Sequence, residues 1–208
     1  MTPSFIASAE LSYFSLADLN NGQRKGSEIR LQFRFASGDW DASFIDGLAA
    51  ASELVLLDNC GIGASSDNGA PFDIRQLAED TARVIKALEF ERASVLGWSL
   101  DGCIAQTLAL EHPARINKLI LLSTDPGGTD AKLASPDVRS RLADMSGTPH
   151  EQARRLLSVL FPADLAESIY QKFGGIVAAA RAQLTSSAGR SRRWTLGTAM
   201  ALATGFGS

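Results

Sequence analysis

Three short strand-like runs, separated by stretches with helical spacing, constrain the fold of this chain more than any other feature. Residues 54–57 and 119–122 are wholly apolar, and the run between them is the short strand 94–96, in which Ser94 precedes two apolar residues. Apolar runs without alternation are typical of strands that are covered on both faces. Between the runs, apolar positions recur with helical spacing over residues 73–88 and 103–108. Because strands that alternate with helices need right-handed crossovers, the sequence predicts an α/β fold with a mostly parallel sheet flanked by helices.

Weaker signals precede the first of these runs. Residues 1–28 combine a short alternating stretch with a polar, turn-rich run, which predicts a hairpin at the edge of the sheet. Residues 29–35 alternate apolar and polar side chains and predict a strand that ends in a loop, and residues 44–48 have helical spacing. In the first long helix, Asp73 is placed as the N-cap and Gln76 to complete a capping arrangement.

The pattern changes after residue 128, where no further strand-like run occurs. Three prolines punctuate stretches that look helical, and these are Pro136, Pro149 and Pro162. We therefore expect several short helices laid over the sheet. The predicted organisation is a core of residues 1–128 followed by a helical, cap-like segment of residues 129–208.

Composition excludes several classes of partner. The chain has 208 residues, 45% of them apolar, which is enough for one substantial core. Its net charge of -3 gives no long-range attraction for nucleic acid or anionic membranes. No secretory leader pattern precedes Glu10, and the apolar stretch 196–206 is too short for a membrane span. Two cysteines without metal-ligand spacing indicate free thiols in a reducing compartment, so we expect a cytoplasmic protein without a metal.

The segment Gly97-Trp98-Ser99-Leu100-Asp101-Gly102 lies between a predicted strand and a predicted helix. It resembles the nucleophile elbow of the α/β-hydrolase family, in which a strained turn presents a serine above the sheet. Three more segments match the family in the right order, namely residues 58–66, 108–113 and 119–128. The chain is therefore identified as similar to the N-terminal part of an α/β-hydrolase, and a partial α/β-hydrolase fold is expected.

The resemblance implies a set of roles around the elbow. Ser99 is the implied nucleophile, which attacks an ester or related acyl carbonyl of a small substrate. The backbone N–H of Leu100 is the implied first oxyanion donor, and the second comes from the loop near Phe35 and Ala36. Trp98 is expected to line the pocket, with a purely packing role as the alternative. No cofactor and no metal are implied.

The family's general base and catalytic acid have no clear counterparts in this sequence. In the family a histidine after the last strand takes the serine proton, and this chain has only His112 and His150. His112 matches a helix end and is expected to cap or pack, while His150 is expected to face solvent at a helix start. Asp125, which follows the last of the three strand-like runs, is either the catalytic acid or a turn residue. Asp101 replaces a small residue of the family, and it either places a charge beside the oxyanion or turns outward.

Three interpretations stay open. The first is an esterase-like, lipase-like or peptidase-like serine hydrolase whose sequence is truncated or frame-altered before the histidine. The second is a non-catalytic relative that binds a small apolar ligand or a protein partner. The third is a short working enzyme with an unusual base. A serine hydroxyl without a neighbouring base is a weak nucleophile, which favours the first two. An unpaired strand at residues 119–122 also predicts self-association through an open sheet edge.

Overall fold

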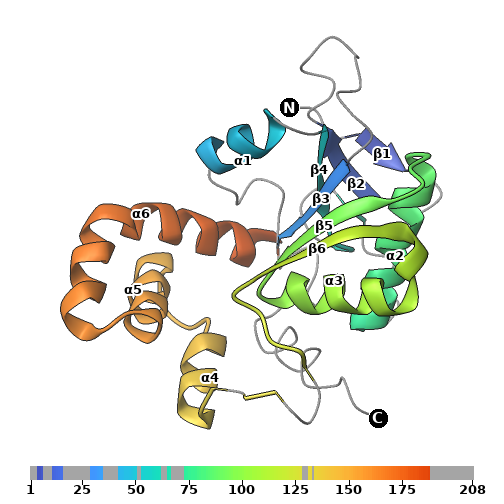
Figure 1. Ribbon diagram of the computed structural model, residues 1–208. Helices are drawn as coiled ribbons and strands as arrows, with labels where there is room; N and C mark the ends of the chain where they lie inside the picture. Colours follow the sequence, from blue (N-terminus) through green and yellow to red (C-terminus); the bar gives the residue numbers. More distant parts are fainter. Residues whose placement is uncertain are drawn as a thin grey trace. The chain divides into compact units, whose positions relative to one another are not determined.

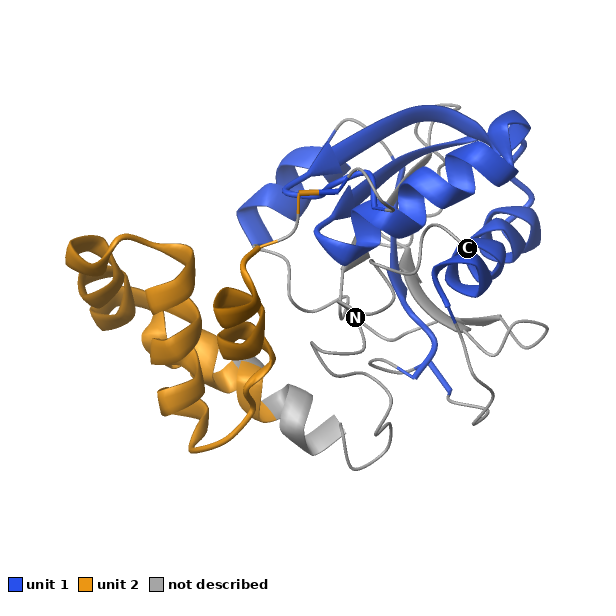
Figure 2. Cartoon of the chain, turned by 90° about the horizontal axis from the view of Figure 1, so that it is seen from below, with its two compact units in different colours: residues 1–131, 201–208 blue, residues 132–200 orange. Residues whose placement is uncertain are grey.

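The structure is a computed structural model of the chain (Figure 1). It describes residues 4–6, 11–15, 29–34, 42–50, 53–61, 65–66, 73–127, 131–132 and 134–187. Before residue 42, at residue 180 and at residues 183–187 only the backbone is described. The chain divides into two compact units (Figure 2). We call residues 1–131 and 201–208 the core unit and residues 132–200 the helical unit.

The described strands of the core unit form one sheet in the order β1-β2-β4-β3-β5-β6. Antiparallel pairing joins β1 to β2 and β2 to β4, while β3, β4, β5 and β6 run parallel. The predicted mostly parallel sheet is therefore confirmed, with an antiparallel β1–β2 pair at one edge. The strands are β1 (Ser4–Ile6), β2 (Leu11–Ser15), β3 (Ile29–Arg34), β4 (Glu53–Asp58), β5 (Ala93–Trp98) and β6 (Ile116–Leu122).

Burial separates the central strands from the last one. The apolar run of β4 is buried throughout, as its lack of alternation predicts, and β5 is buried from Ala93 to Gly97. The prediction of a buried strand at residues 119–122 was wrong, because Leu119, Leu121 and Leu122 are 37–39% exposed. The reason is topological: β6 ends the strand order and pairs, among the described strands, with β5 alone.

Three helices of the core unit each follow a strand (Figure 1). Ile45 of α1 packs with Leu54 and Leu56 of β4, so α1 covers one face of that strand. Helix α3 lies along β5 and β6 and packs against α2. The helices are α1 (Ala42–Ala49), α2 (Ile74–Ala87) and α3 (Leu100–Glu111), the last followed by a 3-10 turn, Pro113–Arg115.

At the start of α2, one of the two predicted capping contacts is present and the other is absent. The carboxylate of Asp73 accepts the backbone N–H of Gln76 at 2.8 Å, as expected of an N-cap. The Gln76 side chain does not complete a capping box, because its amide donates to Asp80 Oδ1 at 3.0 Å. The cap therefore uses one of the two predicted bonds.

The helical unit contains α4 (Pro136–Ala143), α5 (Pro149–Leu160) and α6 (Ala163–Ser187). Each helix begins at or just after one of the three prolines, because proline suits the first helical turn. Only short helices were expected here, and α6 is longer, with 25 residues. Its two interior glycines lower helix propensity by about 1 kcal/mol each and do not end it. The interpretation of this unit as a cap stays a prediction.

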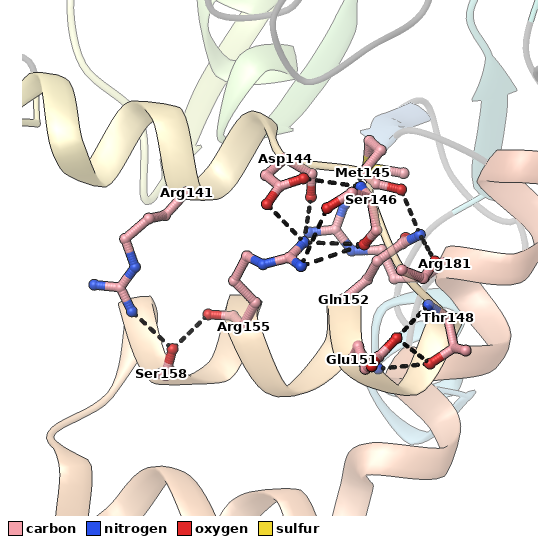
Figure 3. A network of polar contacts seen from close by, with 11 residues as sticks. Arg141, Asp144, Met145, Ser146, Thr148, Glu151, Gln152, Arg155, Ser158 and Arg181 are labelled. Atoms are coloured by element: carbon pink, nitrogen blue, oxygen red, sulfur yellow. Dashed lines mark hydrogen bonds and ion pairs between the residues drawn. The ribbon is translucent and has the colours of Figure 1, made fainter.

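A polar network holds the start of α5 to the segment before it (Figure 3). Thr148 and Glu151 form a reciprocal capping box. The side chain of Gln152 donates to the Met145 carbonyl oxygen at 2.8 Å, and Arg155 makes an ion pair with Asp144 at 3.3 Å.

Among the described residues, no helix is long and apolar enough to cross a membrane.

Candidate active site

Ser99 occupies the junction between β5 and α3. Its backbone has φ 56° and ψ -121°, a region that non-glycine residues rarely adopt. The turn is tight enough that a Cβ at Gly97 would lie 2.4 Å from the carbonyl oxygen of Asp101. The strained serine and the glycine two residues earlier are therefore two parts of one sharp bend.

Two backbone hydrogen bonds fix this bend. The N–H of Ser99 donates to the Leu122 carbonyl oxygen at 2.9 Å, which ties the turn to the end of β6. The N–H of Gly102 donates back to the Ser99 carbonyl oxygen at 3.0 Å. Gly102 must also be small, because a Cβ there would lie 2.4 Å from Thr124 Cβ. Ser99 itself is exposed, and its side chain does not cap α3.

The residues expected to bind the oxyanion are only partly described. Leu100 is the first residue of α3, where backbone N–H groups lack helical acceptors and the helix end is positively polarised. Trp98 is the last residue of β5 and is half-buried. Phe35 and Ala36 lie outside the described residues. The helix start thus supplies one electropositive group beside Ser99, and the assigned roles stay predictions.

Asp101 does not turn outward, which was one of its two expected orientations. Its side chain is buried, with 3% of the residue exposed, and Oδ1 accepts a hydrogen bond from Asn59 Nδ2 at 2.9 Å. Asn59 follows β4 and is equally buried. Sequence reasoning did not single out Asn59, and its only signal was its place in the glycine-paired turn of residues 58–63.

Asp125 forms a turn at the end of β6. Its Oδ1 accepts the N–H of Gly127 at 2.7 Å, the contact expected of a turn aspartate. Its carbonyl oxygen accepts from Gln106 Nε2 at 2.8 Å, which holds the segment against α3. The hydrogen bond to Gly127 supports the interpretation of Asp125 as a turn residue. Its role as the catalytic acid stays a prediction.

Both histidines have partners of their own. His112 caps the C-terminus of α3, and its Nε2 lies 2.9 Å from Glu79 Oε2 on α2. Because α3 has 12 residues, it separates His112 from Ser99 by about 18 Å. His150 is exposed in the first turn of α5, where its Nδ1 lies 3.0 Å from the Tyr170 hydroxyl. In the described part of the core unit, no imidazole reaches Ser99.

Cys103 lies one turn after Ser99 on the buried side of α3. Its Sγ is 3.7 Å from Thr124 Oγ1, and burial raises the pKa of the thiol above its ordinary value. Because the thiolate is the reactive form, a raised pKa together with burial makes this cysteine unreactive. Cys103 is therefore a packing residue of the site.

We expect iodoacetamide at mildly alkaline pH to modify Cys60 well before Cys103. Cys60 is half-buried at the surface turn after β4, whereas Cys103 is 3% exposed and has the raised pKa. Mass spectrometry of peptides from native and urea-treated protein measures both rates. Equal modification of the two thiols in the native protein would contradict this assignment.

Sequence comparison decides the family. A family model described as the alpha/beta hydrolase fold matches residues 34–201, which is most of the chain. The chain belongs to the α/β-hydrolase family. Its partial sheet, its strand-turn-helix elbow and the helices that follow are those of this fold.

Individual relatives of this α/β-hydrolase are hydrolases and esterases. It is 42% identical over 98 residues to a pimeloyl-(acyl-carrier protein) methyl ester esterase of Edwardsiella ictaluri, a match covering 47% of this chain and 36% of the relative. It is 36% identical over 84 residues to a poly(3-hydroxyalkanoate) depolymerase of Ectopseudomonas oleovorans, covering 40% of the chain and 30% of the relative. The chain thus spans less than half the length of these curated relatives, and its truncation stays a prediction.

A solved structure supports the same family. A hydrolase from Pseudomonas aeruginosa PA01 superimposes with a TM-score of 0.66 and 25% sequence identity, covering 98% of this chain and 72% of that one. Among the described residues, no group of three or more His, Cys, Asp or Glu side chains is arranged to hold a metal ion.

Proposed function

We propose that this α/β-hydrolase cleaves a small ester or related acyl substrate with Ser99 as the nucleophile. The observation that carries the proposal is the strained, exposed Ser99 at the positively polarised start of α3. The ester chemistry of the matched relatives supports the choice of substrate class. We also infer a cytoplasmic location, because cysteines in the reduced state, such as Cys60 and Cys103, are typical of that compartment.

The proposed reaction uses the elbow in two ways. The Oγ atom of Ser99 bonds to the carbonyl carbon and loses its proton to water, and the charge that forms on the carbonyl oxygen is stabilised by the N–H of Leu100. Collapse of this intermediate breaks the bond to the leaving alkoxide, which takes up a proton from water and leaves as the alcohol. Water then adds to the acyl-Ser99 ester, which releases the carboxylic acid and restores the Ser99 hydroxyl. Asp125 is retained as a candidate acid partner.

The described core unit places no imidazole beside Ser99, which limits the rate. A serine hydroxyl is almost fully protonated at neutral pH, and general-base help contributes about 10²–10⁴-fold to such reactions. Slow turnover is therefore the expected behaviour. The same observation favours a second candidate function, in which the protein binds a small apolar ligand or a protein partner without cleaving it.

We expect the purified protein to hydrolyse a short-chain nitrophenyl ester slowly and Ser99→Ala to abolish that rate. Release of nitrophenol measures turnover, and mass spectrometry after treatment with a fluorophosphonate locates the modified residue. Ser99→Ala removes the nucleophile while leaving an exposed position at the turn, so its thermal unfolding serves as the folding control.

The outcomes separate the two candidate functions. A slow rate that depends on Ser99 supports the hydrolase, whereas turnover at the wild-type rate in Ser99→Ala contradicts it. An apolar ester that binds without turnover and without labelling favours the ligand-binding candidate. A fast, Ser99-dependent rate would show that a base acts which the described core unit does not contain.

We further propose that the protein self-associates through β6. This strand ends the described sheet, and three of its leucines are more than a third exposed. Strands at the end of a sheet that expose apolar side chains invite association with another chain. We expect the elution volume in size-exclusion chromatography to fall as the protein concentration rises, and Leu121→Lys to reduce this shift because lysine opposes edge pairing. A sharp monomer peak at every concentration would overturn the proposal.

A further inference from the structure

A buried hydrogen bond joins the turn after β4 to the first turn of α3. It runs from Asn59 Nδ2 to Asp101 Oδ1 over 2.9 Å, between residues 42 positions apart in the sequence. Each residue is only 3% exposed. The bond gives the buried Asn59 amide a partner, and burying an amide without a partner is costly.

The bond spans strands that are not neighbours. In the sheet β3 lies between β4 and β5, so the carboxyl ends of β4 and β5 are separated by about 10 Å. Asn59 follows the end of β4, and Asp101 follows the end of β5 by three residues. The pair therefore connects the turn after β4 to the first turn of α3, two segments that the backbone ladder does not join.

The Asn59 side of this bridge is itself fixed. The hydroxyl of Ser65 donates to the Asp58 carbonyl oxygen at 2.7 Å, and the N–H of Gly61 donates to the Ser66 carbonyl oxygen at 3.0 Å. These bonds close the turn in which Asn59 lies. A side chain anchored in a closed turn can restrain its partner across the sheet.

The Asp101 side of the bridge is part of the elbow. Asp101 lies in the first turn of α3, two residues after Ser99. Its carbonyl oxygen lies so close to Gly97 that it leaves no room for a Cβ there. Its carboxyl group lies in the first turn of α3, close to the helix start where the ester oxygen would gain charge. The hydrogen bond to Asn59 keeps that carboxylate turned toward the turn after β4.

We propose that Asn59 is a positioning residue for hydrolysis at Ser99, which acts through its buried bond to Asp101. The bond orients the first turn of α3, so that the Leu100 N–H meets the developing oxyanion and the Asp101 carboxylate stays turned toward Asn59. This inference rests on the proposed hydrolase function, and it adds Asn59 as the residue that couples two loops of the site. A misplaced oxyanion donor lowers the rate without weakening substrate binding.

The test compares three variants with the wild type in nitrophenyl ester turnover and in fluorophosphonate labelling. Asn59→Leu removes the donor at nearly constant volume, and we expect kcat to fall roughly tenfold or more while KM changes by less than about twofold. The double variant Asn59→Asp/Asp101→Asn exchanges donor and acceptor, and we expect it to recover kcat to within roughly threefold of the wild type. Asn117→Leu makes the same substitution at an exposed position on β6 and is expected to keep the wild-type rate.

The results distinguish the failure of this inference from the failure of the proposed function. A rate that does not depend on Ser99 overturns the function. A Ser99-dependent rate that Asn59→Leu leaves unchanged overturns the inference alone. Should Asn59→Leu not fold, the double variant decides, because a folded protein with the reversed pair and a rate more than roughly tenfold below the wild type also overturns the inference.

Discussion

Gly97→Ala is expected to lower the free energy of unfolding by about 3 kcal/mol and to abolish the reaction of Ser99 with a fluorophosphonate. A Cβ at this position would lie 2.4 Å from the Asp101 carbonyl oxygen and 2.7 Å from Gly102 Cα. Both atoms are backbone of the first turn of α3, so they cannot rotate away as a side chain can. The new methyl group must push the helix start off β5, which opens the turn that presents Ser99. Urea unfolding followed by circular dichroism measures the loss.

The same substitution at Gly47 is the matched control. Gly47 is exposed on α1, and a Cβ built there meets nothing within 4 Å. Alanine favours a helix over glycine by about 1 kcal/mol, so Gly47→Ala is expected to be neutral or slightly stabilising. Equal unfolding midpoints for Gly97→Ala and Gly47→Ala would show that the elbow is looser than the structure has it.

Features set by local periodicity could be predicted from the sequence. The buried strand β4, the N-cap at Asp73 and the turn at Ser99 each depend on residues within one segment. The turn at Ser99 was predicted from the resemblance of residues 97–102 to the nucleophile elbow. The structure adds the reason for its glycines, because a Cβ at Gly97 would meet Asp101 and one at Gly102 would meet Thr124, which follows β6.

Features set by tertiary neighbours could not be predicted. An apolar run shows that a strand is apolar and does not show how many strands pair with it, so β6 was expected to be buried although it ends the described sheet. The length of α6 was missed because glycines weaken a helix without determining its end.

The candidate site likewise contains one feature set by local sequence and one set by a tertiary contact. The position of Ser99 follows from its own segment, but Asp101 is hydrogen-bonded to Asn59, which is 42 residues away in the sequence. No periodicity or spacing relates the two residues. Their contact exists only because the order of strands brings the ends of β4 and β5 to the same edge of the sheet.

Leu108→Ala is expected to destabilise the core unit by about 2–5 kcal/mol, a range that makes it comparable with the largest effects of single substitutions. Leu108 is fully buried on α3, among the largest side chains that the described structure excludes from water. Alanine removes its apolar contacts and leaves a cavity between α3 and its neighbours. The surrounding residues are closely packed and cannot move enough to fill this cavity completely. Because α3 carries the elbow at its other end, labelling of Ser99 is expected to weaken at temperatures where the wild type is still folded.

Leu110→Ala separates this effect from a change in helix propensity. Leu110 lies two residues further along α3 and is 76% exposed, so the same truncation there removes little buried surface and is expected to change stability by about 0.5 kcal/mol or less. Urea unfolding of the two variants isolates the contribution of burial, since the helix and the residue types are identical. If Leu110→Ala were as destabilising as Leu108→Ala, the exposed face of α3 would have to be covered in solution, and the assignment of its buried face to the sheet and α2 would be wrong.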